Sequence, residues 1–436
     1  MGAALPKVAS KKGTLRATYL LETPLEPTKV ADVLAGEQSS GTFVRVAGET
    51  DDLRARSRAT VDHVEELDPA QAPSLPNALL ERKGSHGPWR RARVTVSFPL
   101  ANIGANLTTI AATVAGNLYD LGETTGVRLE RVQISPEYRA RFERPRFGVA
   151  GTRELTGVAQ GPLVGTIIKP NVGLSAAATG ALVGQLCEAG VDFIKDDECC
   201  ANPDHAPISE RVPAVMERVR RWQEKSGKQV MVAFNISDDH DAMLRHADLV
   251  AREGGSCVMV SLNWCGLSSV QALRRHLGTD SGIAIHGHRN GYGMFSRHPA
   301  LGMDFQPYQL LWRLAGVDHM HVHGLQGKFA QSDTEVTRSA QDCLTPLADP
   351  ADAADRVMPA FSSGQWAGTI PATLATVPSG DLLFMAGGGI LAHPGGPRAG
   401  VVSLRQAWMA ASAGQSLADA AREAPELRAA LAFYGK

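Results

Sequence analysis

Eight short apolar runs separated by amphipathic stretches constrain the fold of this chain more than any other feature of its sequence. The runs are Leu163–Ile168, Val191–Ile194, Val230–Phe234, Val258–Leu262, Ile283–Ile285, Met320–Val322, Met358–Phe361 and Leu382–Met385. The segments between them have helical periodicity, and several end in glycine, the residue that helix C-termini favour. Eight strand–helix units of about 30 residues each account for the ~250 residues of a (β/α)8 barrel. We therefore predict an α/β fold with a TIM barrel over residues 141–436; a doubly wound parallel sheet is the alternative.

The first 140 residues have a different pattern, which predicts a smaller α+β domain over residues 1–140. Leu15–Leu21 and Ala92–Phe98 alternate like half-buried strands, residues 25–35 and 106–120 have helical periodicity, and the Pro- and Gly-rich stretch 68–88 is expected to be a loop.

Charge and cysteine content exclude several function classes. The chain has 44 Lys+Arg against 45 Asp+Glu, so it has no overall field that would hold nucleic acid or a membrane surface. No window approaches the ~20 apolar residues that a membrane helix needs. The six cysteines form no C-x-x-C pair, and we interpret them as free thiols of a cytoplasmic protein.

Polar residues gather directly after the predicted strands, where barrel active sites lie. They are Lys169-Pro170-Asn171, Lys195-Asp196-Asp197-Glu198, Asn235, His286-Gly287-His288-Arg289, His321-Val322-His323 followed by Gly324–Lys328, Ser362-Ser363-Gly364 and Gly387-Gly388-Gly389. A structural protein has no need for such a concentration of polar groups at one end of its strands.

The stretch after the second run suits a divalent cation. Period 2 places Lys195 and Asp197 on one side of the strand, with Glu198 at its exit. Two convergent carboxylates are typical ligands of Mg²⁺. An ammonium would repel the metal, but CO2 can convert Lys195 into a carbamate that offers an anionic oxygen.

The H-x-H pairs allow a second interpretation, a zinc hydrolase, because each pair faces one side of its strand. For His286, His319 and His323 we favour a role as core histidines that bond to the backbone. The triple glycine, together with Ser363-Gly364, suggests a phosphate site, because the last two strand-to-helix loops of such barrels often bind phosphate.

Taken in order, these segments resemble the large subunit of ribulose-1,5-bisphosphate carboxylase/oxygenase (RuBisCO), and more closely the RuBisCO-like proteins. The matching segments are GEQSSGTF (36–43), AGNLY (115–119), GTIIKPNVGLS (165–175), GVDFIKDDE (190–198), HGHRNGYG (286–293), AGVDHMHVHGLQGKF (315–329), SSG (362–364) and GGGILAHPGGPRAGVVSLRQAW (387–408). The resemblance implies a ferredoxin-like N-terminal domain and a homodimer or a multiple of it.

The resemblance also implies roles for individual residues. Lys195 matches the carbamylated lysine, which binds Mg²⁺ together with Asp197 and Glu198. Lys169 matches the lysine that moves protons at the substrate carbon, His288 an active-site histidine, and Lys328 the tip of a mobile loop. Arg289, His321 and Ser363 match the binders of one phosphate; Gly387, Gly388 and Thr42 match a second phosphate site; Glu37 matches a residue contributed across the dimer interface.

Departures from the family pattern bear on the reaction. Asn171 stands where the carboxylase has a second lysine, and we expect it to bind substrate there. Thr109 stands where the carboxylase has an asparagine that contacts substrate. Phe43 replaces a tryptophan, and Gln365 replaces a glycine near the second phosphate. We therefore expect no carboxylation of ribulose bisphosphate, while the metal site and one phosphate site remain.

RuBisCO-like proteins form an enediolate from a phosphorylated substrate in three known ways. We favour decarboxylation of 3-oxo-isoapionate 4-phosphate to a ketotetrose phosphate and CO2, with carboxyl transfer and hydrolysis left open. The alternatives are the 2,3-diketo-5-methylthiopentyl-1-phosphate enolase and the 5-methylthioribulose-1-phosphate isomerase of methionine salvage. An alternative of another class is a structural or regulatory protein without activity, which retention of Lys169, Lys195, Asp197 and Glu198 disfavours.

Overall fold

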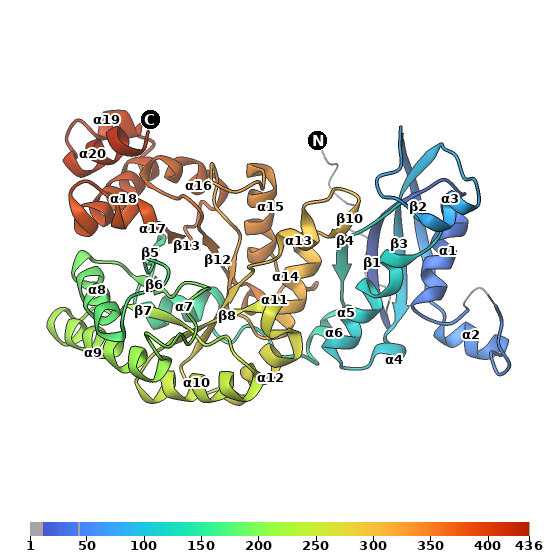
Figure 1. The fold of residues 1–436 in the computed structure, drawn as a ribbon, viewed down its shortest axis with the longest axis horizontal. Coiled ribbons are helices and arrows are strands. Elements are labelled where there is room, and N and C mark those ends of the chain that lie inside the picture. Colours follow the sequence, from blue (N-terminus) through green and yellow to red (C-terminus); the bar gives the residue numbers. More distant parts are fainter. Residues whose placement is uncertain (1–11, 42–43, 436) are drawn as a thin grey trace. The chain divides into compact units, whose positions relative to one another are not determined.

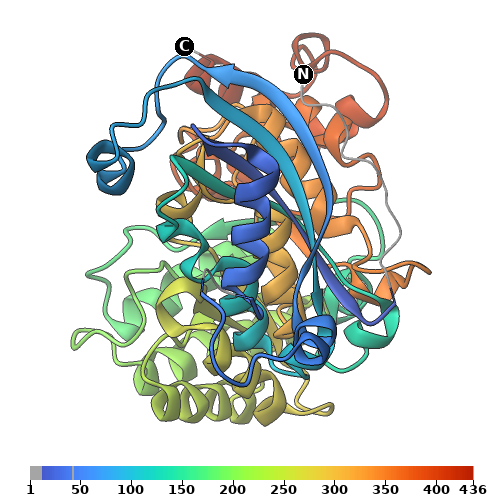
Figure 2. The same ribbon diagram turned by 90° about the vertical axis from the view of Figure 1, so that its right-hand side faces the viewer.

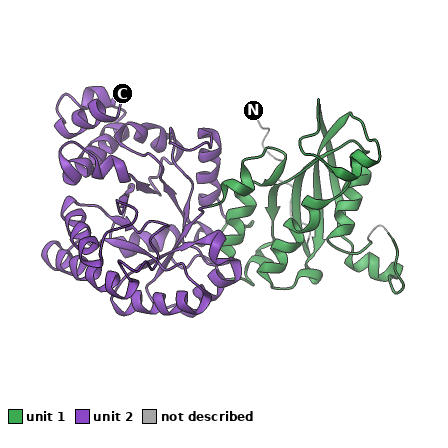
Figure 3. Ribbon diagram, viewed as in Figure 1, with its two compact units in different colours: residues 1–142, 291–314, 347–352 green, residues 143–290, 315–346, 353–436 purple. Residues whose placement is uncertain are grey.

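The computed structural model describes residues 12–41 and 44–435, which form two compact units (Figure 3). Unit 1 comprises residues 1–142, 291–314 and 347–352, and unit 2 comprises residues 143–290, 315–346 and 353–436. Two stretches from within the predicted barrel sequence thus belong to the unit that contains the N-terminal residues. The predicted division into contiguous domains at residue 140 stays a prediction.

Unit 2 contains a closed barrel of eight parallel strands, in the order β11-β12-β13-β5-β6-β7-β8-β9. Figure 1 labels most of these strands and shows the helices that surround them. The strands are β5 (Leu163–Ile167), β6 (Phe193–Lys195), β7 (Met231–Asn235), β8 (Cys257–Ser261), β9 (Ala284–His288), β11 (His319–His321), β12 (Met358–Phe361) and β13 (Leu383–Met385). Each overlaps one of the eight apolar runs, and barrel closure excludes the doubly wound sheet. The predicted fold class is therefore confirmed.

Helices surround the barrel and begin and end at residues that suit their positions. They are α7 (Gly148–Thr156), α8 (Ala176–Ala189), α9 (Ile208–Ser226), α10 (His240–Arg252), α11 (Leu262–Cys265), α12 (Leu267–Leu277), α15 (Asp333–Leu344), η2 (Ala353–Asp355), η3 (Ala367–Thr369), α16 (Ile370–Thr376), α17 (Gly387–Leu391), α18 (Gly396–Ser412), α19 (Leu417–Ala420) and α20 (Pro425–Tyr434). In α8, for example, the Ser175 side chain caps the first turn by accepting from Ala178 N, and Gly190 ends the helix in a left-handed conformation. Inward side chains of the strands, among them Phe193 and Met259, form the barrel core, and residues of α7 pack against it.

Unit 1 contains a five-stranded sheet in the order β10-β4-β1-β3-β2. Its strands are β1 (Thr14–Thr23), β2 (Thr60–Ala70), β3 (Trp89–Pro99), β4 (Gly126–Gln133) and β10 (Leu301–Met303), and its helices are α1 (Pro27–Glu37), α2 (Asp51–Ser57), α3 (Ala78–Arg82), α4 (Leu100–Ile103), α5 (Leu107–Ala115), η1 (Asn117–Asp120), α6 (Pro136–Arg139), α13 (Gly293–Ser296) and α14 (Phe305–Leu314). Helix α1 lies across one face of this sheet, against β1, β2 and β3 (Figure 2). The chain order β1-α1-β2-β3-α5-β4, with β4-β1-β3-β2 as neighbours, is the expected ferredoxin-like arrangement.

Two local expectations for unit 1 were wrong. The stretch 68–88 is not entirely loop, because it contains the end of β2 and helix α3. The stretch 106–120 is not one helix, because α5 ends before Gly116 and a short 3-10 helix follows. Within the described ranges, no helix combines the length and the apolar character that crossing a membrane requires.

Candidate active site

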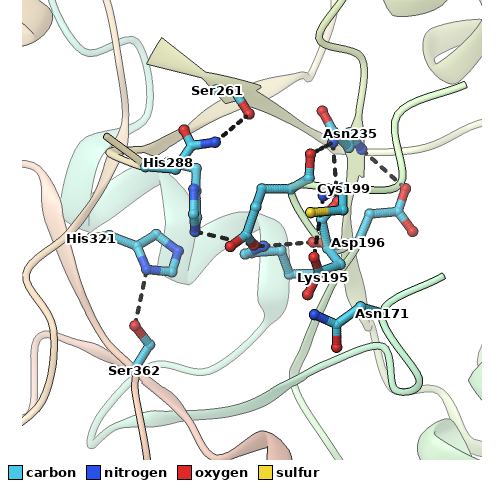
Figure 4. Close-up of polar contacts among 12 residues, drawn as sticks. Asn171, Lys195, Asp196, Cys199, Asn235, Ser261, His288, His321 and Ser362 are labelled. Carbon is cyan, nitrogen blue, oxygen red and sulfur yellow. Dashed lines mark hydrogen bonds and ion pairs between the residues drawn. The ribbon is translucent and has the colours of Figure 1, made fainter. Parts of the chain in front are cut away.

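Lys195 is the last residue of β6 and lies at the carboxyl end of the barrel strands (Figure 4). Its side chain is only 1% exposed, and its Nζ donates to the Asp196 carbonyl oxygen at 2.6 Å. The Glu198 carboxylate lies 3.9 Å from the same Nζ. Burial lowers the pKa of Lys195 to about 8, although the neighbouring carboxylates oppose the shift. A neutral amine, the form that reacts with CO2, is therefore accessible near neutral pH.

The adjacent carboxylates Asp196 and Asp197 point in different directions. Asp196 lies 3.3 Å from the Arg211 guanidinium and accepts from the Asn235 backbone N–H at 3.0 Å. Burial raises the pKa of Asp196, and Arg211 opposes this shift. Asp196 thus connects β6, α9 and β7, which leaves Asp197 as the carboxylate available to the site, as the alternation along the strand predicts.

Lys169, which follows β5, lies beside Asp197. Its Nζ is 3.0 Å from Asp197 Oδ2 and 2.5 Å from Asn171 Oδ1, so the two acceptors hold the ammonium between them. The Lys169 side chain is 39% exposed, and it can therefore reach a substrate from solvent. The other Asp197 oxygen accepts from the Cys199 backbone N–H at 3.2 Å.

Glu198 and His288 approach each other across the barrel mouth, with 3.6 Å between Glu198 Oε2 and His288 Nε2. Burial lowers the pKa of His288, and the Lys195 charge lowers it further. The Asn235 side-chain amide donates to the carbonyl oxygens of Asp197 and Glu198, at 3.0 and 3.3 Å. Sequence reasoning placed Asn235 near the site without a role; its amide holds the backbone from which both carboxylates project.

The donor set at this mouth fits a divalent cation only if Lys195 is modified. Within residues 12–41 and 44–435, no group of three or more His, Cys, Asp or Glu side chains is placed to hold a metal ion. Asp197 and Glu198 offer two carboxylates, and a carbamate on the buried Lys195 amine would add a third anionic oxygen. The zinc-hydrolase interpretation would need histidine ligands, and three of the histidines, His286, His319 and His321, have their ring nitrogens in contact with one another or with hydroxyl groups.

Three histidines of the H-x-H pairs bond to one another and to hydroxyl groups, namely His286, His319 and His321. His286 and His319 are fully buried, as expected, but their partners are side chains rather than the backbone. His286 Nε2 lies 2.7 Å from His321 Nε2. His323 departs further from the expected core role, because it is partly exposed, has a positive φ of 67° and contacts the Phe329 ring.

The first predicted phosphate site is partly assembled. Arg289 is 3% exposed and donates from Nη2 to Gln331 Oε1 at 2.7 Å, a contact that sequence reasoning missed. His321 has both ring nitrogens in hydrogen-bond contact, with His286 and with Ser362 Oγ at 3.1 Å, so it has no free nitrogen for an anion. Ser363 is partly exposed with a φ of 74°, and its Oγ lies 3.4 Å from Ser362 Oγ.

The second predicted phosphate site involves Gly387 and Gly388 at the start of α17. A Cβ on Gly388 would meet no heavy atom within 4 Å, so the Gly388 backbone borders open space. The Gly388 carbonyl accepts from the Tyr434 hydroxyl at 2.8 Å. Thr42 lies outside the described residues. Glu37 is the exposed last residue of α1 and belongs to unit 1.

The loop after β11 carries Lys328, whose Nζ lies 5.3 Å from the centre of the Phe329 ring. Its backbone N–H donates to the Ser363 carbonyl at 3.2 Å, which ties this loop to the loop after β12. Gln365 is buried, donates to the Leu325 carbonyl at 3.1 Å and accepts from Thr369 at 3.0 Å. Its side chain therefore fixes the base of the Lys328 loop, a role that the sequence did not reveal.

Comparison with known proteins agrees with this geometry. The models for the ribulose bisphosphate carboxylase large chain match residues 148–434 (catalytic domain) and 9–138 (N-terminal domain). A rubisco-like protein from Burkholderia fungorum, known from its crystal structure, is 67% identical to this chain in sequence. The two structures superpose with a TM-score of 0.91, and the match covers 97% of this chain and 100% of that chain. A 3-oxo-isoapionate-4-phosphate transcarboxylase/hydrolase from Xanthobacter autotrophicus is 47% identical over 96% of this chain and 98% of its own length. A 3-oxo-isoapionate-4-phosphate decarboxylase from Rhizobium rhizogenes is 42% identical over 97% of this chain and 98% of its own length. The chain therefore belongs to the ribulose bisphosphate carboxylase large-chain family, as one of its RuBisCO-like enzymes.

Proposed function

We propose that this enzyme is a carbon–carbon lyase that decarboxylates 3-oxo-isoapionate 4-phosphate to a ketotetrose phosphate and CO2. The observation that carries the proposal is the cluster of Lys169, Asp197, Lys195 and Glu198 at the barrel mouth, in a chain whose relatives at 42–47% identity are named for reactions of this substrate. A β-keto acid loses CO2 readily once its ketone is polarised, and this cluster is built for that task.

Asp197, Glu198 and a carbamylated Lys195 would hold Mg²⁺ in the active form. When bound there, Mg²⁺ supplies electrostatic stabilisation of the negative charge that develops on the substrate oxygens. The 1% exposure of Lys195 and its lowered pKa support the modification, since CO2 reacts with the neutral amine.

Lys169 is the proton donor in this proposal. When the bond between the carboxyl carbon and its neighbour breaks, its electron pair passes to the ketone and forms an enediolate. The Lys169 ammonium then protonates the carbon that lost the carboxyl group. Asp197 and Asn171 support this role, because both accept from Lys169 Nζ and orient it at the mouth. Lys328 would turn from the Phe329 ring toward the departing carboxylate.

Carboxylation of ribulose bisphosphate is not part of the proposal. Asn171 offers an acceptor to Lys169 where the carboxylase has a second cation. Thr109 is shorter than the asparagine that it replaces. Decarboxylation needs neither group, because it requires only a polarised ketone, a cation near the leaving carboxylate and one proton donor.

The direct test is incubation of the enzyme, activated with CO2 and Mg²⁺, with 3-oxo-isoapionate 4-phosphate. We expect release of CO2 together with a four-carbon ketose phosphate. Lys169→Met should lower kcat by ~10²–10⁴, the usual effect of removing a positioned proton donor. Lys225→Met is the matched control, since Lys225 is exposed on α9, and it should leave kcat unchanged. Rapid enolisation of the methionine-salvage diketone phosphate without carboxyl loss would reject the proposal.

Carboxyl transfer and hydrolysis is the second candidate, because the relative at 47% identity is named a transcarboxylase/hydrolase. Substrate labelled with ¹³C in its carboxyl group separates the two reactions. A decarboxylase releases the label as CO2, whereas a transcarboxylase/hydrolase retains it in a non-volatile acid. Either result leaves the substrate assignment intact.

The substrate phosphate is proposed to bind at Arg289 and Ser363. Arg289→Ala should raise KM strongly, by the equivalent of roughly 2–5 kcal/mol, because the buried guanidinium is a rigid donor for an anion. An unchanged KM would move the phosphate to the Gly387–Gly388 site. Equal turnover of the unphosphorylated sugar acid would contradict both assignments.

We further propose that the active unit is a homodimer or a multiple of it, in the cytoplasm. The resemblance assigns Glu37 and Thr42 to the partner's site, and the six cysteines are free. Undiminished activity of a monomer at nanomolar concentration would reject the dimer.

A further inference from the structure

A continuous line of hydrogen-bond contacts crosses the barrel interior. It begins at the Thr152 hydroxyl on α7, which lies 2.8 Å from His319 Nε2. His319 Nδ1 lies 3.3 Å from His286 Nδ1, and His286 Nε2 lies 2.7 Å from His321 Nε2. His321 Nδ1 lies 3.1 Å from Ser362 Oγ, a contact visible in Figure 4. The line thus joins the amino end of β11 to the loop that follows the carboxyl end of β12.

Every member of this line is buried. His286 and His319 are 0% exposed, His321 is 3% exposed, and Ser362 is 6% exposed. Burial lowers the pKa of all three histidines, that of His319 to about 3, so the rings are neutral. A neutral imidazole carries one N–H and one bare nitrogen. Because the rings share contacts, the tautomer of one ring dictates the tautomer of the next.

Only two arrangements of protons satisfy the whole line, and they run in opposite directions. In the first, His319 donates from Nε2 to Thr152, His286 donates from Nδ1 to His319, and His321 donates from Nε2 to His286. Ser362 then donates to His321 Nδ1. In the second arrangement every donor becomes an acceptor, so Thr152 donates to His319.

The contacts of Thr152 decide between the two. Its hydroxyl oxygen is in hydrogen-bond contact with the Gly148 carbonyl oxygen one turn earlier in α7. A carbonyl can only accept, so the single hydroxyl proton of Thr152 is the donor in that contact. Thr152 therefore has only lone pairs to offer His319, and the first arrangement follows.

We propose that Thr152 is a positioning residue for the active site: its hydroxyl fixes the tautomers of His319, His286 and His321 and thereby commits the hydroxyl proton of Ser362 to His321. Ser362 then offers Ser363 only acceptor lone pairs. The 3.4 Å contact between the two hydroxyls therefore forms only when Ser363 donates, and Ser363 must give up that contact to donate to an anion. This last consequence rests on the proposed phosphate site, whereas the tautomers do not.

Neutron diffraction of the unmodified enzyme, produced in D2O, tests the tautomers directly. We expect deuterium on His319 Nε2, His286 Nδ1 and His321 Nε2. Deuterium on the opposite nitrogens would overturn the inference. This measurement needs no substitution and therefore does not depend on the folding of any variant.

Variants test the role of Thr152. In Thr152→Val, His319 Nε2–H loses its acceptor, and the ¹⁵N signals of the three histidines should report the reversed tautomers. Thr152→Ser keeps the hydroxyl group and should therefore give the same histidine signals as the unmodified enzyme. Thr156→Val is the matched control, because Thr156 is a buried threonine one turn later in α7 whose hydroxyl bonds to the Thr152 carbonyl at 2.8 Å. Unchanged tautomers in Thr152→Val would reject the role of Thr152.

Binding of inorganic phosphate to the same variants separates this inference from the proposed function. Reversal of the tautomers lets Ser362 donate to Ser363, which frees the Ser363 proton for the anion. Thr152→Val should therefore bind phosphate more tightly, by roughly fivefold for one added neutral hydrogen bond. General damage to the fold would weaken binding instead. Reversed tautomers with unchanged phosphate affinity would support the role of Thr152 and reject the phosphate site at Ser363.

Discussion

Two of the buried charged groups in the barrel, Asp318 and Lys195, lie at opposite ends of its strands, and their surroundings differ. Asp318 precedes β11 at the amino end and is fully buried. One of its oxygens accepts from the backbone N–H groups of Phe147 and Gly148, at 2.6 and 3.0 Å. The other accepts from Ile285 N at 2.8 Å and lies 3.4 Å from Arg274. Four donors thus surround one carboxylate.

Lys195, at the carboxyl end, is buried to a similar degree but has fewer close polar partners in the protein. Its three N–H groups have one short contact, with the Asp196 carbonyl at 2.6 Å, and a longer one of 3.9 Å to Glu198. Buried charges normally need close partners, since desolvation is expensive. Asp318 meets that requirement and joins β11 to α7 and β9, whereas Lys195 does not and is poised to change its chemical form.

The largest expected effect separates activity from stability at Lys195. Lys195→Met should reduce turnover to background, because the site loses the group that becomes a metal ligand. The thermal midpoint should stay constant or rise, since an apolar side chain replaces a poorly solvated amine. Steady-state assays and calorimetry of the same preparation provide the check. Full activity in CO2-free buffer without Mg²⁺ would contradict the proposed role of Lys195.

A substitution of Asp318, at the amino end of the barrel strands, should lower stability and leave activity largely unchanged. Asp318→Asn removes the charge that pairs with buried Arg274 and should destabilise the fold by roughly 3–5 kcal/mol, the usual cost of breaking a buried pair. Urea denaturation measures the loss. Below the new melting temperature, KM and kcat should remain near their original values; a selective fall in kcat would show that the two ends of the barrel are not separable in this way.

The third expected effect is on the rate of CO2-dependent activation at Lys195, which should depend on pH. Below the pKa of Lys195, about 8, the neutral fraction falls tenfold for each pH unit, so the rate of CO2-dependent activation should fall likewise and level off above pH 8. Because this pKa is lower than the ~10.4 of an unfolded lysine, the Lys195 contribution to stability should also rise with pH between those values. Pre-incubation with CO2 at several pH values, followed by assay at one pH, measures the first effect. An activation rate that is flat between pH 6.5 and 8 would contradict it.

The smallest effect concerns the orientation of Lys169. Asn171→Ala removes one of the two acceptors of the Lys169 ammonium, while Asp197 remains. The loss of one such contact should lower kcat by roughly fivefold to tenfold, with KM little changed. Asn171→Asp keeps the acceptor and should retain kcat. A large rise in KM for Asn171→Ala would assign the asparagine to substrate binding instead.

The sequence predicted the barrel because its strands are buried on both faces and therefore appear as uninterrupted apolar runs. Strand β2 was missed because its residues are mostly exposed and give no such signal. Strand β10 has only three residues and pairs with β4, far away in the sequence. Local pattern cannot reveal that pairing.

The site was predictable to the extent that strand ends determine it. The predicted residues lie at or just after the carboxyl ends of β5, β6 and β9, which meet at one mouth of the barrel, and the structure brings them together; they are Lys169, Lys195, Asp197, Glu198 and His288. The supporting contacts of Thr152, Gln331 and Gln365 depend on which loops meet in space, so their residue types alone gave no indication. The bonding of His321 to His286 likewise follows from the pairing of β9 with β11.

The pairing of β10 with β4 has a consequence for how the chain is made. β10 completes the sheet of unit 1 beside β4, yet roughly 170 residues separate Gln133 from Leu301. At ~5–20 residues per second, the ribosome needs about 10–30 s to add that length. During that interval the β4 edge displays unpaired backbone groups, which other nascent chains can recruit. Slowed elongation between these two strands should therefore increase aggregation during synthesis, even though every residue of the finished enzyme is unchanged.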